Sequence, residues 1–333
     1  MDEIICNKCL KRPAQVRLEY GPSDYCAICF CDLFEKRVAK ANREFQLLRR
    51  GDRIGVGVSG GKDSAAVLYI LHKMAKKFGH IEIVPICIDE GIKGYRDKAI
   101  VKCEELCTQL GLKLNIYTYK ELFETTMDKV VSKRENLETW KGACSYCGVF
   151  RKYALNLAAR KLKCNKLAVG HNADDVAQTV FMNFMRNEPQ RMRRFGVTTE
   201  DFEQELFVTR IKPLVYCLER ECAIYCTLKE LPFHLQECPH SSESFRGEVK
   251  DFLNQVESKH PGSKFNIIRS FLVLQKELKK SDPQIPESTR KKPGKCEECG
   301  EYTSMQKCKA CQLKKEVNSV KSKVKTVKKK RIV

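Results

Sequence analysis

Short runs of aliphatic and β-branched residues alternate with longer amphipathic stretches through the middle of the chain. The short runs predict buried strands at residues 52–58, 81–88, 112–119 and 166–170. The amphipathic stretches predict helices at about 62–77, 95–110, 121–133, 148–162 and 171–186. Because strands alternate with helices, the pattern predicts an α/β fold: a doubly wound parallel sheet with helices on both faces, similar to the Rossmann fold.

A glycine-rich turn joins the first strand to its helix: residues 57–64 read Gly-Val-Ser-Gly-Gly-Lys-Asp-Ser. Glycines let backbone N–H groups converge on an anion, and the start of a helix adds positive potential. Val56 and Asp63 break the Walker A pattern. The turn instead resembles the Ser-Gly-Gly-x-Asp-Ser signature of the PP-loop ATP pyrophosphatases, which adenylate a substrate oxygen. The resemblance implies ATP binding by Gly57, Ser59, Gly60, Gly61, Lys62, Asp63 and Ser64.

Two later strands also end in polar residues. Asp89 follows the second strand, and Gly170 begins the segment Gly-His-Asn-Ala-Asp-Asp after the fourth. The carboxyl edge of a parallel sheet is where α/β folds bind ligands. We expect Asp89 and Gly170 to contact ATP, and Asp174 and Asp175 to serve catalysis by holding Mg²⁺ or the adenylated intermediate. Helix capping is the simpler alternative for these carboxylates.

The composition adds two features, 19 cysteines and a net charge of +20. The first residues show no pattern of a secretory signal, so we expect an intracellular protein, in which pairs with the spacing Cys-x-x-Cys favour metal binding. The sets Cys6, Cys9, Cys26, Cys29 and Cys296, Cys299, Cys308, Cys311 each predict a four-sulfur Zn²⁺ site. Half of the excess charge lies in residues 291–333, which favours a polyanionic partner such as nucleic acid.

These patterns divide the chain of 333 residues into segments. We expect an Arg-rich, loop-like stretch at 187–210 and mostly helix from 211 to 280. No run reaches the ~18–20 apolar residues of a membrane helix, so we expect a soluble cytoplasmic protein. The expected segments are an N-terminal zinc ribbon (1–33), a linking helix (34–50), the catalytic domain (51–280), a linker (281–295), a C-terminal zinc ribbon (296–313) and a basic, disordered tail (314–333).

A fifth Cys-x-x-Cys pair, Cys144 and Cys147, falls inside the catalytic domain. A metal or cluster needs more ligands than two, and spacing alone does not choose among the remaining cysteines. Two thiols could also work without metal, through a persulfide and then a disulfide. The candidates for a further ligand are Cys164, Cys217, Cys222, Cys226 and Cys238, the last in Glu-Cys-Pro-His.

This combination of a PP-loop, an internal Cys-x-x-Cys, a later Cys-Pro and two zinc ribbons resembles the tRNA 2-thiolation enzymes of the TtuA/NcsA type. The resemblance covers residues 1–311 and implies a 4Fe-4S cluster held by Cys144, Cys147 and Cys238, with one iron open. Cys238 matches because its Cys-Pro follows a strand-like segment, residues 233–235. The other eight cysteines (31, 87, 103, 107, 164, 217, 222 and 226) are then core or surface thiols.

The implied reaction is ATP-dependent thiolation of the wobble uridine of tRNA. The C2 oxygen of the base is adenylated, and cluster-bound sulfur then displaces AMP. Arg151 or Lys152 would neutralise charge on the adenylate, where related enzymes often have lysine. The basic stretches 186–194 and 314–331 would follow tRNA phosphates. The resemblance also implies Mg²⁺ with ATP, a homodimer and a sulfur donor, either free sulfide or a ubiquitin-like thiocarboxylate protein.

Other functions are also compatible with the sequence. The same chemistry could act on another tRNA base, ribothymidine in the T-loop or cytidine in the anticodon loop. An ATP-dependent amide or lysidine synthetase shares the PP-loop but has no use for Cys144, Cys147 and Cys238. A zinc-ribbon RNA-binding protein with a vestigial PP-loop is a non-enzymatic alternative, which the intact signature at 59–64 disfavours.

Overall fold

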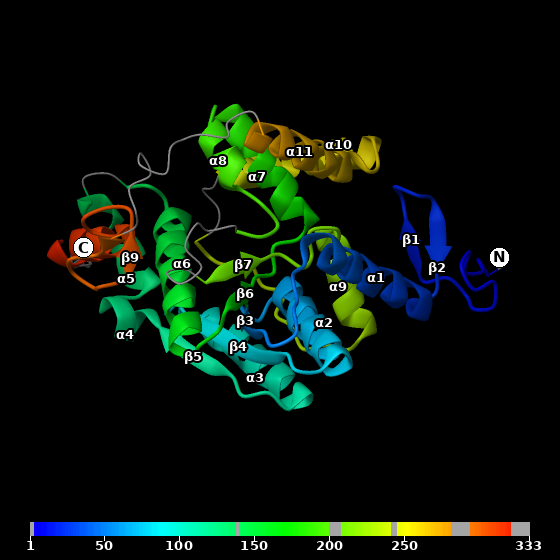
Figure 1. Ribbon diagram of the computed structural model, residues 1–333, viewed down its shortest axis with the longest axis horizontal. Helices are drawn as coiled ribbons and strands as arrows, with labels where there is room; N and C mark the ends of the chain where they lie inside the picture. Colours follow the sequence, from blue (N-terminus) through cyan, green and yellow to red (C-terminus); the bar gives the residue numbers. More distant parts are fainter. Residues whose placement is uncertain (1–2, 138–139, 200–207, 241–244, 281–293, 321–333) are drawn as a thin grey trace, which may run out of the picture.

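The computed structural model describes residues 3–137, 140–199, 208–240, 245–280 and 294–320, without the side chains of 278–280 (Figure 1). A five-stranded parallel sheet forms its centre, in the order β5-β4-β3-β6-β7. The predicted parallel α/β sheet is therefore confirmed. Its strands are β3 (Arg53–Gly57), β4 (Glu82–Asp89), β5 (Asn115–Thr118), β6 (Lys166–Ala168) and β7 (Thr209–Ile211).

The strands are buried on both faces, and this explains their nearly continuous apolar sequences. In β4, Ile83 and Cys87 pack in one core, whereas Val84, Ile86 and Ile88 pack in the other. The first core contains α2 (Lys62–Phe78), α3 (Arg96–Leu110), α1 (Ala27–Phe45) and α9 (Glu219–Leu228). The second contains α6 (Ala143–Lys161), α4 (Tyr119–Phe123) and α5 (Met127–Ser132), which η1 (Arg134–Asn136) follows.

A group of four helices lies beyond the β7 side of the sheet, at the top of Figure 1. α7 (Ala173–Met185) contacts each of the other three, α8 (Pro189–Arg194), α10 (Phe245–Lys259) and α11 (Ser263–Lys280). Among the described residues, no helix is long and apolar enough to cross a membrane.

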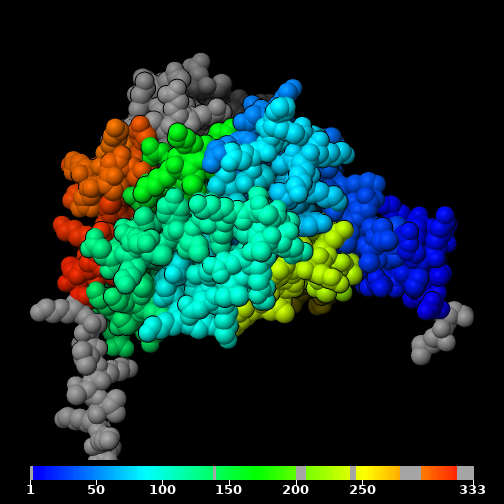
Figure 2. Space-filling view, turned by 90° about the horizontal axis from the view of Figure 1, so that it is seen from below, coloured from blue at the N-terminus to red at the C-terminus, as the bar shows by residue number. Residues whose placement is uncertain are grey.

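The two cysteine modules sit at opposite ends of the molecule in both views (Figures 1 and 2). The N-terminal module consists of the hairpin β1 (Val16–Leu18) and β2 (Ser23–Tyr25), which leads into α1. The C-terminal module consists of the hairpin β8 (Gly294–Lys295) and β9 (Tyr302–Thr303), followed by α12 (Lys309–Ser319). Both modules are packed on the catalytic domain, because Phe34 of α1 stacks on Tyr225 of α9 at 4.4 Å and α12 contacts α6.

Several helix limits differ from those predicted. α2 and α3 confirm the helices at 62–77 and 95–110, but α1 begins at Ala27 and so crosses the expected boundary at 33/34. The predicted helix at 121–133 is interrupted, because Glu124 has φ +56° and Thr126 caps a new helix. The helix expected from 148 begins at Ala143, so Cys144 and Cys147 lie in the first turn and a half of α6.

Three other expectations were wrong. Residues 233–235 form no strand, and the loop-like stretch 187–210 contains α8 and the start of β7. Residues 314–319 belong to α12, because Leu313 and Val317, one turn apart, bury their side chains in the core beside α6. Most of the expected linker (281–293) and the rest of the expected tail (321–333) lie outside the described residues.

We expect the substitution Phe34→Ala to destabilise the whole catalytic domain, because it removes a buried ring that joins α1 to α9. Truncation of a buried phenylalanine costs about 3–5 kcal/mol. Ile28→Ala is the matched control on the same helix, since the Ile28 side chain is exposed and its loss costs below about 0.5 kcal/mol. Scanning calorimetry measures both effects. A main unfolding transition unchanged by Phe34→Ala would mean that the N-terminal module folds independently.

Candidate nucleotide and cysteine site

The phosphate loop lies between β3 and α2 and is shaped by a close approach to α3. Gly60 has φ +81°, and a Cβ there would lie 2.3 Å from the carbonyl oxygen of Ala99. Ser64 holds the loop closed: its hydroxyl accepts a hydrogen bond from the Ser59 N–H at 3.0 Å and donates one to the Gly61 carbonyl at 2.9 Å. Because Gly61 is the N-cap of α2 and has no side chain, the first turn of the helix is open to an anion.

The charged side chains of the loop are held by acidic and amide partners. Lys62 Nζ lies 3.0 Å from Glu219 Oε1 and 3.4 Å from Asp63 Oδ2. Burial works against the charge of Lys62, but these two carboxylates outweigh it and raise its pKa. Asp63 accepts a hydrogen bond from Asn172 Nδ2 at 3.0 Å, and burial raises its pKa. Lys250 of α10 also binds Glu219, at 2.9 Å, so the α10–α11 pair reaches the loop.

The other predicted nucleotide residues line the same sheet edge. Gly57 ends β3, and Asp89 at the end of β4 accepts the Gly91 N–H at 2.8 Å. Gly170 packs directly on the start of α2, since a Cβ there would lie 3.0 Å from the Ser64 nitrogen. The loop, the end of β4 and the end of β6 therefore meet at one edge.

The two adjacent carboxylates after β6 have different surroundings. Asp174 is buried, pairs with Lys264 and accepts the Glu219 N–H at 2.6 Å, so it ties α7 to α9 and α11. Asp175 forms the capping box of α7 with Asn172 and lies 3.6 Å from Arg246. Burial raises the pKa of Asp175 to about 6. The Asp175 side chain is 32% exposed, against 6% for Asp174, and the charge of Asp63 contributes to the raised pKa of Asp175.

The three predicted cluster cysteines are neighbours, but in the described part of the chain their sulfur atoms are not all within 4.8 Å of one another, as those of the two four-cysteine sets are. Cys144 is exposed, while Cys147 and Cys238 are half-buried. Burial raises the pKa of Cys238, and the negative charges of Cys147 and Cys144 add to the effect, as expected for neighbours. The backbone places Cys238: the His234 N–H donates to the Gly60 carbonyl at 2.7 Å, and the chain then turns so that the His240 carbonyl lies 3.8 Å from Cys144 Sγ. One segment thus links the phosphate loop to the cysteines.

Of the two candidate cations on α6, Arg151 faces the cysteines. Its NH2 group lies 3.2 Å from Cys147 Sγ, and its Nε donates to Glu90 Oε1 at 2.8 Å. Lys152, the next residue, points about 100° away from Arg151 around the helix axis. Its charge acts instead on Lys212, whose pKa falls to about 8 through burial and the charges of Arg210 and Lys152.

Sequence reasoning missed several residues of the site. His171 follows β6 and is exposed; desolvation by the groups around it lowers its pKa to about 3, and the charge of Lys212 adds to the effect. Glu90 and Arg96 form a buried ion pair at 2.9 Å behind the loop. A buried charge gives no pattern in a single sequence, although Glu90 directly follows Asp89. The missed residues are Glu90, Arg96, His171, Lys212, Glu219, His234, Arg246 and Lys250.

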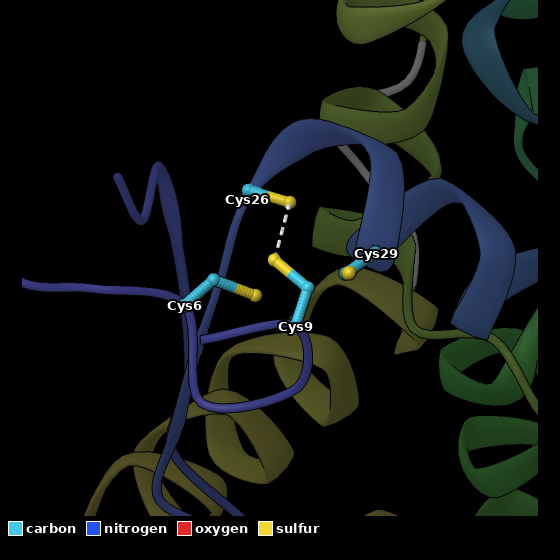
Figure 3. Close-up of side chains that lie close together, drawn as sticks. All are labelled: Cys6, Cys9, Cys26 and Cys29. Atoms are coloured by element: carbon cyan, nitrogen blue, oxygen red, sulfur yellow. Dashed lines mark hydrogen bonds between the residues drawn. The ribbon is translucent and has the colours of Figure 1, made fainter. Parts of the chain in front are cut away.

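Both predicted four-cysteine sets are assembled, and each has its sulfur atoms within 4.8 Å of one another. The four sulfur atoms of the N-terminal set point toward one another (Figure 3). Cys9 and Cys26 are 3.9 Å apart, and Cys299 and Cys308 3.8 Å. Tetrahedral zinc with ~2.3 Å bonds needs an edge of about 3.8 Å, so the sets fit such a metal.

The eight cysteines outside these sites are all buried. They are therefore core thiols, and two of them support the phosphate loop from α9. Cys226 Sγ lies 3.1 Å from the Lys62 carbonyl, and Cys222 is a neighbour of Asp63. Cys31 lies on α1, where its side chain packs in the first core, and it is not part of the N-terminal four-cysteine set.

Comparison with known proteins gives consistent matches. Residues 33–257 match the PP-loop domain family. The chain is 37% identical to the tRNA 2-thiolation protein NcsA of Haloferax volcanii, covering 95% of this chain and 99% of that protein. It is 36% identical to the cytoplasmic tRNA 2-thiolation protein 1 of Schizosaccharomyces pombe, covering 94% and 90%. The solved structure of the U34-tRNA thiolase NcsA from Methanococcus maripaludis with its 4Fe-4S cluster matches with a TM-score of 0.72 at 33% identity, covering 83% and 89%.

We expect Asp175→Asn and Asp174→Asn to change stability in opposite directions. The folded pKa of Asp175, about 6, lies above its ordinary value of 3.8, so ionisation disfavours the fold increasingly as pH rises from 4 to 6. Asp175→Asn should therefore raise the melting temperature at pH 7.5, and the gain should shrink as pH falls below 6. Asp174→Asn leaves Lys264 buried without its carboxylate and should cost about 3–5 kcal/mol.

Thermal unfolding of both variants between pH 4.5 and pH 8 is the measurement. A pH-independent change for Asp175→Asn would contradict burial as the cause of the raised pKa of Asp175.

Proposed function

Because the chain belongs to the family of tRNA 2-thiolation proteins, which carry a PP-loop domain, we propose that it is an ATP-dependent tRNA sulfurtransferase. Its substrate is the wobble uridine of tRNA, and its product is 2-thiouridine. The same relatives indicate that it acts in the cytoplasm.

One observation supports this proposal most directly. The segment 232–240 binds the phosphate loop through the His234 N–H and carries Cys238 toward Cys144. A nucleotide on the loop and a sulfur nucleophile at the cysteines would therefore be joined by one short segment of chain. A synthetase that forms amides uses an amine as the nucleophile, and an amine does not require cysteine ligands beside the phosphate loop.

The chain's own groups would bind ATP and stabilise the leaving pyrophosphate. The open first turn of α2 and the ammonium group of Lys62 offer hydrogen bonds and positive charge to the phosphates. Lys250 also lies 2.9 Å from Glu219, so Glu219 would keep a partner if Lys62 turned to a phosphate. Asp63 and Asp175 would hold Mg²⁺, which supplies charge neutralisation for the phosphates.

The proposed thiolation consists of two substitutions, the first at the α-phosphorus of ATP and the second at C2 of uracil. The C2 oxygen of uracil attacks the α-phosphorus of ATP, the bond to the β-phosphate oxygen breaks, and pyrophosphate leaves. Sulfide then adds at C2, and the C–O bond breaks with release of AMP. The first step turns a poor leaving group into a good one. Arg151, whose NH2 group lies 3.2 Å from Cys147 Sγ, would offset the negative charge of the adenylate.

The cysteine site fits a 4Fe-4S cluster by its donor set. Cys144, Cys147 and Cys238 would supply three thiolates, since the charges of Cys144 and Cys147 act on Cys238 and that of Cys144 acts on Cys147. Three ligands leave one iron without a protein ligand. When bound, the cluster supplies an open iron that keeps sulfide deprotonated. Tyr119 donates a hydrogen bond to the Cys147 carbonyl at 2.9 Å and so orients that end of α6.

The expected partners follow from the family and from the basic segments. We propose that α8 and the residues near it, 186–194, contact tRNA phosphates together with the basic C-terminal residues. The family also leads us to propose a homodimer and a sulfur donor that is either free sulfide or a ubiquitin-like thiocarboxylate protein. The two four-cysteine sets would each hold a structural Zn²⁺.

Anaerobic turnover tests the proposed reaction. The protein, reconstituted with iron and sulfide, is given Mg-ATP, sulfide and an unmodified tRNA transcript with a wobble uridine, and mass spectrometry maps thiolated nucleosides. We expect 2-thiouridine at the wobble position and none with Cys238→Ala. Cys164→Ala, at a buried thiol outside the site, is the control and should retain activity. Thiolation of another base would change the substrate, and pyrophosphate without thiolated product would refute the proposed nucleophile.

Metal analysis tests the ribbons separately. We expect two zinc ions per chain, and one after either Cys9→Ser or Cys299→Ser. Because structural zinc contributes directly to folding, each variant should also unfold at a lower temperature. Cys31→Ser, next to the N-terminal set but outside it, should retain both ions. Equal zinc contents in all four proteins would mean that the sets do not bind zinc.

A further inference from the structure

Glu90 is a buried carboxylate between two arginines that come from different parts of the fold. It directly follows β4, and its side chain is only 3% exposed. Oε1 accepts a hydrogen bond from Arg151 Nε at 2.8 Å, and Oε2 lies 2.9 Å from Arg96 Nε. A buried carboxylate is tolerated only with such partners. Arg151 is oriented by Glu90, whereas Arg96 has further backbone acceptors and pairs with Glu90 by charge alone, since neither Glu90 Oε2 nor Arg96 Nε forms a hydrogen bond with a described residue.

The first arginine connects Glu90 to the cysteine site. Arg151 lies on α6 one turn after Cys147, and its NH2 group is 3.2 Å from Cys147 Sγ. A guanidinium group is planar, so fixing Nε on Glu90 also fixes the direction of the NH2 group. The side chain is half-exposed, and without Glu90 it would have the freedom to turn into solvent.

The second arginine connects Glu90 to the phosphate loop. Arg96, at the start of α3, is buried, and its NH1 group donates to the Ser59 carbonyl at 2.8 Å. Its NH2 group donates to the Ile88 carbonyl, so the guanidinium spans the ends of β3 and β4. The loop also rests on α3 at Gly60, and a shift of Arg96 would therefore alter the loop.

We propose that Glu90 is a positioning residue that couples nucleotide binding on the phosphate loop to the state of the cysteine site. The inference rests on the function proposed above. The chain of contacts runs from the Ser59 carbonyl through Arg96, Glu90 and Arg151 to Cys147 Sγ. An anion on the loop changes the field at Ser59, and the rigid pairs carry that change to the guanidinium beside the cysteine. Binding at either site then changes affinity at the other, by the same factor in both directions.

The test measures this factor without turnover. The affinity for α,β-methylene ATP, which resists cleavage between the α- and β-phosphates, is measured by calorimetry for cluster-loaded and cluster-free protein. We expect the two wild-type affinities to differ by about fivefold or more. In Glu90→Gln, which removes the charge and keeps the shape, we expect the ratio to fall to about one. In the wild-type protein, the electron paramagnetic resonance signal of the reduced cluster should shift when the analogue is added. In Glu90→Gln the analogue should leave that signal unchanged.

Glu105→Gln is the matched control, because Glu105 lies on α3, is exposed and pairs with Lys102 of the same helix. It should keep the wild-type ratio. Arg151→Lys is the second variant, for the case in which Glu90→Gln does not fold. It keeps the positive charge at position 151 and leaves the Glu90–Arg96 pair in place. A single ammonium group, however, does not bridge Glu90 and Cys147. We expect the same loss of coupling there.

The proposal is overturned if the wild-type protein binds the analogue equally well with and without the cluster. It is also overturned if folded Glu90→Gln or Arg151→Lys keeps the ratio of affinities that the wild type shows. A purely structural Glu90 would lower the melting temperature while the ratio stayed the same. Neither the affinity ratio nor the resonance signal depends on tRNA. The experiment can therefore refute the coupling while the proposed thiolation stands, and the reverse also holds.

Discussion

The parallel arrangement of the sheet is the constraint on which the site depends. Parallel strands all end at the same edge, so segments far apart in the chain meet there. β3 delivers the phosphate loop, β4 delivers Asp89 and Glu90, and β6 delivers Gly170. The close contact of Gly60 with Ala99 and of Gly170 with Ser64 leaves no room for side chains. The backbone itself therefore forms the surface of the sheet edge at these two positions, and charged side chains lie around it.

The charges at this edge fall into two classes. Asp174 and Glu90 are buried but paired with Lys264 and with arginines, so they stabilise the architecture. Asp175, His171 and Lys212 have pKa values shifted toward their neutral forms, to about 6, 3 and 8, chiefly by burial. Groups that a fold keeps in an unfavourable environment are typical of functional sites. The fold thus places paired charges behind the phosphate loop, and it places groups whose pKa values favour the neutral form near the ends of β6 and β7.

Individual elements show how far prediction from sequence reached. The phosphate loop and both four-cysteine sets were identified correctly because their spacing is local and chemically demanding. The prediction failed at β7 and at residues 233–235. β7 has only three residues and depends on pairing with β6, and the stretch 233–235 is held by the phosphate loop rather than by a strand. Long-range hydrogen bonds decided both, and a local pattern does not contain them.

The sequence by itself determined the chemical groups that are present: a glycine-rich loop of the PP-loop type, thiols in pairs, and the family to which the chain belongs. These depend on residues within a few positions of one another, where backbone geometry alone brings the groups together. Only the tertiary structure decided which cation faces the cysteines, which of two adjacent aspartates is free to act, and that Glu90 joins the two halves of the site. Those outcomes depend on burial and on partners up to 90 positions away, since a charge leaves water only where the fold supplies its counterion.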